Sequence, residues 1–337
     1  MKAACIERTG PPEVIELRDL PEPSPRPGQV LVRVTASAVN PIDTYVRAGS
    51  VAMPLEFPFV VGCDLAGEVV AVGEGVGSPR PGMRVWGSNQ GLLGRQGTAA
   101  EYTLVDPRWL YPTPEAVTDA EAAAAALVGI TAHLGLVEHG RLAAGETLFI
   151  HGGSGGVGQM VVQVAKRLGA KVIATAGSPA KREIVSSLGA DVVLDYHRDD
   201  LVEAVREAAG GGVDLHWETR REPDFDEAIG MLAEGGRMIL MAGRDARPPL
   251  PVGPFYVKEC SLHGFVMFKA SPQTQAAAAA DLNRWLADGM RARIDRIVPL
   301  EATAEAHALQ EASTVGGGGQ LAGKIVIDPR GVPGGRG

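Results

Sequence analysis

The chain has 337 residues, of which 45% are hydrophobic and 21% charged, and its formal net charge is −8. This length allows two domains with sizeable cores, and the composition is typical of a globular chain rather than a disordered one. The negative charge argues against a nucleic acid as the main partner, because binding to phosphates needs an excess of Lys and Arg.

The cysteines and the apolar segments indicate the compartment. Cys5, Cys63 and Cys260 are far apart and form no CxxC pair, which suits a reducing environment and gives no disulfide framework. The first residues contain no apolar run of signal-peptide length. Residues 122–137 are the most apolar stretch, but they are rich in Ala and include His133, which favours a buried helix over a membrane span. We therefore expect a cytoplasmic protein with no membrane partner.

The first 121 residues predict a domain of short strands and turns. In residues 28–40, three valines at every second position alternate with Leu31, Arg33 and Thr35, which is the pattern of a half-buried strand. Residues 59–76 and 84–90 show similar short apolar runs bounded by turn residues. This part of the chain is expected to be an irregular, β-rich domain.

From residue 122 the pattern changes to alternating strands and helices. A buried strand at 146–153 is followed by a helix in which Val157, Val161, Val164 and Leu168 share one face, with Gly169 at the C-cap position. A second strand at 171–177 precedes a helix that begins near Pro179, and the unit repeats through residue 243. Five such alternations predict an α/β fold with a doubly wound parallel sheet of the Rossmann type.

The remaining residues predict a return to the first domain. A long Ala-rich helix is expected at 274–288, and the strand 325–328 (IVID) ends the ordered chain. We expect a β-rich domain formed by 1–121 and 265–330, a nucleotide-binding domain at 122–264, and a disordered tail at 331–337. The glycines 316–319 predict a flexible loop.

A glycine cluster, HGGSGGVG at 151–158, follows the first strand of the alternating region. Gly153, Gly155 and Gly158 match GxGxxG, which by itself is a weak signal in a chain with 44 glycines. Its position between an apolar strand and an amphipathic helix strengthens it, because glycine lets the backbone approach a pyrophosphate at the helix N-terminus. A purely structural turn is the alternative. The context favours a dinucleotide site.

The end of the next strand lacks the acidic residue that would bind a ribose 2′-hydroxyl. Gly177 and Ser178 are followed by Lys181 and Arg182, which could hold a 2′-phosphate. Two charge-assisted hydrogen bonds of about 1.5 kcal/mol each would favour NADP over NAD by roughly a hundredfold. The alternative is that the two cations are a solvated helix face. We predict NADP(H) as the cofactor.

No zinc site is evident in the sequence. The seven histidines are scattered, and His133 and His139 fall on different faces of a helix. Cys63 is a lone thiol that is expected to be buried in the core. These observations favour a reductase with no metal, whose substrate needs no Lewis acid.

Six motifs together resemble a known family. The chain is similar to the zinc-free quinone oxidoreductases of the medium-chain dehydrogenase/reductase superfamily, and most similar to the zeta-crystallin-like branch. The resemblance covers nearly the whole chain in order, and implies a GroES-like catalytic domain beside the Rossmann domain. The motifs are NPIDTYVRAG (40–49), GCDLAGEVVAVGEGV (62–76), GITAHLGL (129–136), HGGSGGVG (151–158), TAGSPAK (175–181) and KECSLHGFVMF (258–268).

The resemblance also accounts for the missing zinc. Where zinc-dependent relatives have a ligand cysteine, this chain has Asn40, and where they have a His-Glu pair it has Cys63 and Asp64. The lobe that would hold a structural zinc falls near 91–102, which contains no cysteine.

Site residues follow from the same resemblance, which implies four groups. Asn40 and Tyr45 would line the substrate cleft next to the nicotinamide. Ser154, Gly155, Gly156 and Val157 would hold the pyrophosphate. Gly177, Ser178 and Lys181 would hold the 2′-phosphate, with Tyr196 beside the adenosine. Thr131, Gly243, Arg244, Phe265 and Val266 would lie along the nicotinamide half.

Two segments depart from the family pattern. Relatives often have a second tyrosine near the position of Val51, which here lies in GSVAMP. Residues 213–225 (VDLHWETRREPDF) differ from the commoner pattern, which contains an aspartate.

The implied reaction is hydride transfer from NADPH to a carbon conjugated with a carbonyl, as in a quinone or an enone. Asn40 and Tyr45 are the expected hydrogen-bond donors to the oxygen that becomes negative. Tyr45 could also give the proton, as could water, or it could simply pack. Asp43 is expected to be structural. The resemblance also implies a homo-oligomer, either a dimer or a tetramer, that associates through the edge of the parallel sheet.

Two other functions stay open. One is an enoyl-thioester reductase, for which a basic cleft mouth would be needed; the candidates are Arg284, Arg291, Arg293 and Arg296. The other is a nucleic-acid-binding or structural role, as in zeta-crystallin-like proteins. The acidic chain has no basic stretches interleaved with aromatics, which argues against nucleic-acid binding.

Overall fold

The computed structural model describes residues 1–314 and 319–331. The predicted loop at 316–319 and the predicted disordered tail fall almost entirely outside these ranges. The chain divides into two compact units, Met1–Leu127 with Ser271–Gly337, and Val128–Ala270. The two boundaries lie at 127 and 270, against 121 and 264 in the sequence-based assignment.

The first unit is built on two sheets. Its smaller sheet has the order β2-β1-β4, and its larger sheet has the order β15-β16-β3-β5-β6-β8, with β7 also paired to β3. The strands are β1 (Lys2–Ile6), β2 (Glu16–Asp19), β3 (Val30–Ala38), β4 (Phe59–Val60), β5 (Leu65–Val72), β6 (Arg84–Gly87), β7 (Tyr102–Val105), β8 (Leu110–Pro112), β15 (Ile294–Pro299) and β16 (Lys324–Asp328). Its helices are α1 (Pro41–Ala48), α8 (Pro272–Ala287) and α9 (Thr303–Thr314).

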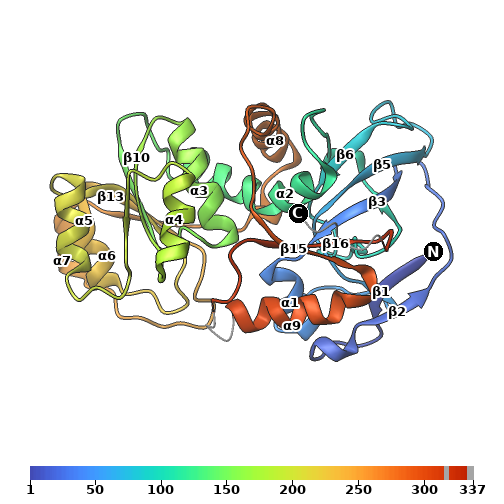
Figure 1. The fold of residues 1–337 in the computed structure, drawn as a ribbon, viewed down its shortest axis with the longest axis horizontal. Coiled ribbons are helices and arrows are strands. Elements are labelled where there is room, and N and C mark those ends of the chain that lie inside the picture. The colour runs from blue at the N-terminus through green and yellow to red at the C-terminus, as the bar shows by residue number, and fades with distance from the viewer. Residues whose placement is uncertain (315–318, 332–337) are drawn as a thin grey trace. The chain divides into compact units, whose positions relative to one another are not determined.

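The predicted return of the chain is confirmed. β16 pairs antiparallel with β3, so strands from opposite ends of the sequence lie side by side (Figure 1). This pairing brings Lys324, the first residue of β16, close to Asn40 at the end of the β3 segment. The β-rich domain is therefore discontinuous, as expected.

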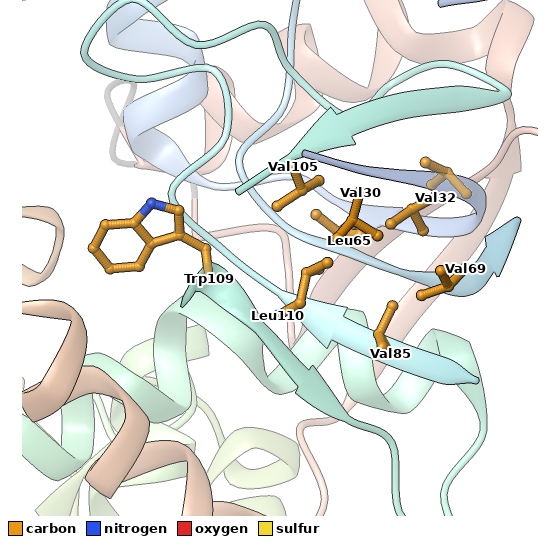
Figure 2. Close-up of a cluster of buried hydrophobic side chains, with 9 residues drawn as sticks. Val30, Val32, Leu65, Val69, Val85, Val105, Trp109 and Leu110 are labelled. Atoms are coloured by element: carbon orange, nitrogen blue, oxygen red, sulfur yellow. The ribbon is translucent and has the colours of Figure 1, made fainter. Parts of the chain in front are cut away.

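Valine-rich strands form the core of this unit (Figure 2). The cluster is composed of Val30, Val32, Val34, Leu65, Val69, Val85, Val105, Trp109 and Leu110. Leu31 was expected on the opposite, solvent-facing side, but it is 5% exposed. The valines at 30, 32 and 34 keep their common face, so both faces of β3 are covered at Leu31, whereas Arg33 is exposed as predicted.

The second unit contains the predicted parallel sheet. Its order is β11-β10-β9-β12-β13-β14, and each neighbouring pair is parallel. This is the 3-2-1-4-5-6 order of a Rossmann fold, so the expected fold class is confirmed. The strands are β9 (Thr147–Ile150), β10 (Lys171–Thr175), β11 (Val192–Leu194), β12 (Val213–Glu218), β13 (Leu232–Leu240) and β14 (Ser261–Gly264). The helices are α3 (Gly156–Arg167), α4 (Pro179–Ser187), α5 (Leu201–Ala209), α6 (Phe225–Met231) and α7 (Val252–Val257).

The most apolar segment forms α2 (Asp119–His133), which continues as a π-helical turn, Leu134–His139. Among the described residues it is the one helix that is long and apolar enough to cross a membrane by length and composition. However, 78% of its most apolar window is buried inside the protein, as the sequence predicts for a core helix.

Candidate functional site: a dinucleotide cradle and a buried charge network

The glycine cluster joins β9 to α3, at the point where the strand order of the sheet reverses. Gly153 donates its N–H to Thr175 O at the end of β10 (2.9 Å), and Gly155 donates to Gly152 O (3.1 Å). These bonds hold the loop against the carboxyl ends of two neighbouring strands. Ligands of doubly wound sheets bind at this kind of reversal.

Two of the glycines pack closely against neighbouring atoms, and Gly158 has no room for a side chain. A Cβ at Gly158 would lie 2.2 Å from Gly152 O, and one at Gly153 would lie 3.0 Å from Val185. Gly155 differs, because a Cβ there would meet only Gly152 O at 3.5 Å. Gly158 and Gly153 therefore pack the loop, whereas Gly155 faces open space that a ligand could enter.

The N-terminus of α3 is suited to an anion. The first intrahelical bond runs from Gln159 N to Gly155 O, so the N–H groups of Gly156, Val157 and Gly158 precede it. The N-cap is Gly155, which has no side chain to accept these donors. Ser154, Gly155, Gly156 and Val157 thus lie where a pyrophosphate could accept from the helix N-terminus, as the resemblance implies.

The residues expected at the 2′-phosphate end lie together after β10. Tyr196 covers Gly177, since a Cβ at Gly177 would lie 2.2 Å from the phenol oxygen. Ser178 is the N-cap of α4, and its Oγ accepts from the backbone N–H of Lys181 (3.3 Å). The second predicted cation, Arg182, pairs with Asp195 (2.6 Å), so its charge is partly neutralised.

The side chains expected along the nicotinamide half are spread over one unit. Phe265 stacks on His139, with ring centroids 4.5 Å apart, and Val266 is exposed beside it. Both line an open hollow of about 480 Å³. Thr131 is buried within α2, while Gly243 adopts a φ of +71° and precedes the exposed Arg244.

Asn40 lies in a buried hydrogen-bond network in the other unit. Its Nδ2 donates to Ala38 O (3.2 Å) and to Asp64 Oδ2 (2.8 Å), and its Oδ1 accepts from the ammonium of Lys324. Its backbone N–H donates to Asp43 Oδ2 (2.8 Å), which forms a capping box at the start of α1. In this arrangement both amide hydrogens are used, so donation to a substrate oxygen would require Asn40 to release Ala38 or Asp64.

The network holds charges that are fully removed from water. Burial raises the pKa of Asp43 to about 7, with the thiol of Cys63 and Lys324 acting in the opposite direction. Burial also raises the pKa of Asp64 and lowers that of Lys324, and each partly offsets the shift of the other. In the sequence, the only signal for Lys324 in this role is that it directly precedes the apolar run IVID.

Tyr45 lies on α1, five residues after Asn40, and is half-buried. Its carbonyl accepts from Ser50 N (3.0 Å), which fixes the end of the helix. The expected pair of donors is therefore carried by one short helix, with Asn40 at the N-cap and Tyr45 in the helix body.

The positions that would bind a catalytic zinc do not fit one. A ligand set needs free thiolate or imidazole donors. Here Lys324 already supplies a cation to Asn40, and burial with two nearby carboxylates raises the pKa of the Cys63 thiol well above its ordinary value. A neutral thiol and a positively charged neighbour both oppose metal binding.

Two family models match the chain. One describes an alcohol dehydrogenase GroES-like domain and covers residues 26–115, and the other describes a zinc-binding dehydrogenase and covers residues 156–283. The chain is 33% identical to a quinone oxidoreductase of Sus scrofa and 31% identical to one of Homo sapiens. Each of these two alignments covers 91% of this chain and 93% of the relative.

Solved structures give a consistent result. An NAD-dependent alcohol dehydrogenase superposes with a TM-score of 0.89 at 32% identity, covering 97% of this chain and 99% of that one. A mycobacterial quinone oxidoreductase and an Escherichia coli quinone oxidoreductase complexed with NADPH each give a TM-score of 0.84, at 31% and 25% identity. Both cover 98% of this chain and 100% of their own.

Proposed function

The chain belongs to the quinone oxidoreductases of the medium-chain dehydrogenase/reductase superfamily, and we propose that it reduces quinones or other α,β-unsaturated carbonyls with NADPH and without zinc. It is an oxidoreductase that binds NADP(H). The single observation that carries the proposal is the α3 N-terminus, where the N-cap Gly155 has no side chain to accept the first N–H groups and leaves open space for a ligand. Lys181 and the absence of an acid at 176–178 support the extra phosphate.

The bound NADPH would supply a hydride to the substrate carbon, and the chain's own residues would meet the charge that develops on oxygen. We assign the donor role to the phenol of Tyr45, and we assign Asn40 a positioning role, since its amide is held by Asp64 and Lys324. Loss of one well-placed donor costs about 2.7–4 kcal/mol in the transition state. Tyr45→Phe should therefore lower kcat tenfold or more while leaving the Kd of NADPH unchanged.

The enoyl-thioester alternative has less support. Among its candidate cations, Arg291 pairs with Glu121 (2.9 Å) and Arg296 with Asp295 (2.9 Å), while Arg284 pairs with Asp281. Cations that are already paired are weaker partners for a coenzyme A phosphate. Nucleic-acid binding is the remaining alternative, and a salt-sensitive gel shift with single-stranded RNA would favour it.

One experiment separates these functions. NADPH oxidation is followed with a simple quinone, an alkenal and crotonyl-CoA, each repeated with NADH because one structural relative is NAD-dependent. We expect turnover of the first two substrates, faster with NADPH, and unchanged after chelation. Preference for crotonyl-CoA, or for NADH, would overturn the assignment.

We also propose that the chain self-associates through the edge strand β14, in the cytoplasm. Leu262 on the edge strand β14 and Val252, Tyr256 and Val257 on the preceding helix α7 are exposed apolar side chains, and an edge strand presents unpaired backbone groups. The three cysteines form no disulfide, which suits a reducing compartment. Light scattering should give the molar mass of a dimer or tetramer, and Leu262→Glu should lower this mass toward that of the monomer.

A further inference from the structure

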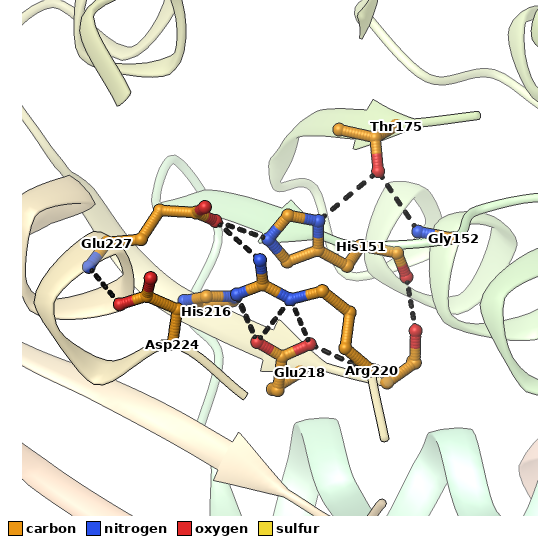
Figure 3. Close-up of polar contacts among 9 residues, drawn as sticks. His151, Gly152, Thr175, His216, Glu218, Arg220, Asp224 and Glu227 are labelled. Carbon is orange, nitrogen blue, oxygen red and sulfur yellow. Dashed lines mark hydrogen bonds and ion pairs between the residues drawn. The ribbon is translucent and has the colours of Figure 1, made fainter. Parts of the chain in front are cut away.

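Three residues with metal-binding side chains face the same side of the parallel sheet. His216 and Glu218 are two residues apart on β12, so their side chains point to one face. β12 pairs with β9 in the register His216 to Phe149 and Trp217 to Ile150, which places Glu218 beside His151. The three residues thus form a compact cluster at the start of the glycine loop (Figure 3).

The cluster is almost fully buried. His151 is 3% exposed, and His216 and Glu218 are 0% exposed. One donor atom from each of the three lies within 4.8 Å of the others. Neither ring nitrogen of His216 has a hydrogen-bond partner among the described residues, and its Nε2 lies 4.0 Å from Glu218 Oε2, too far for a hydrogen bond. A buried imidazole without partners carries an uncompensated desolvation cost.

We propose that His151, His216 and Glu218 form a binding site for a zinc-like divalent transition-metal ion. Two imidazoles and one carboxylate are a donor set that such ions take, with a fourth position left to water or another group. Zn–N distances of about 2.0–2.1 Å put donor atoms roughly 3.3 Å apart. The three side chains would therefore have to draw together by about 1 Å on binding.

Neighbouring groups already orient the donors. His151 Nε2 lies 3.0 Å from Glu227 Oε1, and its Nδ1 lies 3.5 Å from Thr175 Oγ1, so a metal ion would take one of these nitrogens and the contact at the other would hold the ring. Glu218 accepts from the guanidinium of Arg220. Histidine and carboxylate ligands in metal sites are commonly held in this way by hydrogen bonds from outside the ligand set.

Arg220 is the group that a metal ion would have to displace. Its Nη2 lies 2.7 Å from Glu218 Oε2 and its Nη1 lies 2.9 Å from Glu227 Oε1, so it neutralises both carboxylates. Its side chain is 29% exposed, which allows it to turn toward solvent. The carboxylates of Glu218 and Glu227 would then bring two negative charges to the site, which matches a dication. The arginine and the metal ion therefore compete for one site.

This site is distinct from the positions of a catalytic zinc in the family. It lies in the Rossmann unit and uses residues of 213–225, the segment that departs from the family pattern. Its occupancy can be measured by binding alone, so the outcome does not depend on the proposed reaction.

The test uses the full chain, stripped of metal by chelation and titrated with Co²⁺. We expect one equivalent to bind, with the visible absorption of a four- or five-coordinate ion. His216→Leu should weaken binding at least tenfold, and Arg220→Gln should tighten it at least tenfold, because the competing cation is gone. His263→Gln, which alters a histidine on the edge strand β14, should bind as the wild type does.

Three results would overturn the proposal. The first is that the wild-type chain binds no Co²⁺ saturably. This includes the case in which only Arg220→Gln binds Co²⁺, because Arg220 would then be the cation that normally fills the site. The second is equal binding by wild type and His216→Leu. The third is equal binding by wild type and His216→Gln, which is the variant to use if the leucine lowers the unfolding temperature.

Discussion

Lys324 donates a hydrogen bond from its ammonium to the side-chain oxygen of Asn40, although the two residues are 284 positions apart in the chain. The same ammonium donates to Val39 O (2.7 Å), and both contacts are buried. They fix the direction of the Asn40 amide, because its oxygen must face the cation and its nitrogen must face Asp64. A buried protein cation thus determines which atoms of the Asn40 side chain are engaged within the network.

Replacing this cation should destabilise the protein. Lys324→Met leaves the carboxylates of Asp64 and Asp43 buried without a countercharge, and removing one partner of a buried pair costs about 3–5 kcal/mol. Urea unfolding should show a loss of this size. Lys2→Met, which removes a surface cation 4.0 Å from Glu301, should change stability by less than about 1 kcal/mol. The double variant Lys324→Met with Asp64→Asn should recover part of the loss, and simple additivity of the two losses would contradict the coupling.

Asp43 should make stability fall as the pH rises from about 4 to 7. Its folded pKa of about 7 lies above the usual value near 4, so the folded state binds the proton more tightly and is favoured most at low pH. Asp64, Cys63 and Lys324 face the same carboxyl, and Asn40 N–H donates to it. Asp43→Asn removes this titration while keeping an acceptor oxygen.

Between pH 5 and 8 the wild type should therefore lose at least about 1 kcal/mol of unfolding free energy relative to Asp43→Asn, since one pKa unit corresponds to 1.36 kcal/mol. Asp19→Asn, at an exposed position of β2, serves as the control. Parallel pH profiles for the wild type and Asp43→Asn would show that Asp43 does not titrate in this range.

Local sequence patterns were sufficient for the elements and for the parallel sheet. Apolar residues at strand and helix spacing, with glycine and proline at the ends, predict β9, α3 and α4 closely. Gly169 follows α3 with a φ of +81°, as expected of a glycine that ends a helix. The Ala-rich pattern predicts the long helix at 274–288, but the helix begins at Pro272, because Ser271 caps it by accepting from Thr274 N. Ser271 followed by Pro272 is itself a helix-start signal, so the sequence contains the correct boundary.

Contacts between distant segments could not be predicted in this way. Nothing local to Lys324 indicates that its strand will return beside β3, and nothing local to Arg182 indicates that Asp195 will neutralise it. The His151, His216 and Glu218 cluster depends on the register between β9 and β12, which no single segment determines. Side-chain contacts of this kind depend on the strand order and register of the whole sheet, which local sequence patterns do not determine.

Lys181 should decide between the two dinucleotides. Lys181→Glu replaces a cation with an anion near the expected 2′-phosphate, so the Kd of NADPH should rise at least tenfold while that of NADH changes by less than about twofold. Fluorescence titration of each reduced cofactor gives both constants. Lys171→Glu makes the same charge change at the other end of β10, and it should leave both constants unaltered. Equal losses for NADPH and NADH would place the phosphate elsewhere.

Replacing Gly155 should weaken NADPH binding, whereas replacing Gly158 should lower the stability of the fold. A methyl group at Gly155 would meet only Gly152 O at 3.5 Å, and its φ of −72° suits alanine, so Gly155→Ala should keep an unfolding temperature close to that of the wild type. The same methyl group would enter the space through which a pyrophosphate approaches, so the Kd of NADPH should rise tenfold or more. In Gly158→Ala the new Cβ would lie 2.2 Å from Gly152 O, and the unfolding temperature itself should fall. Thermal unfolding and NADPH titration of both variants separate the two effects, and wild-type affinity in Gly155→Ala would remove this loop from the binding site.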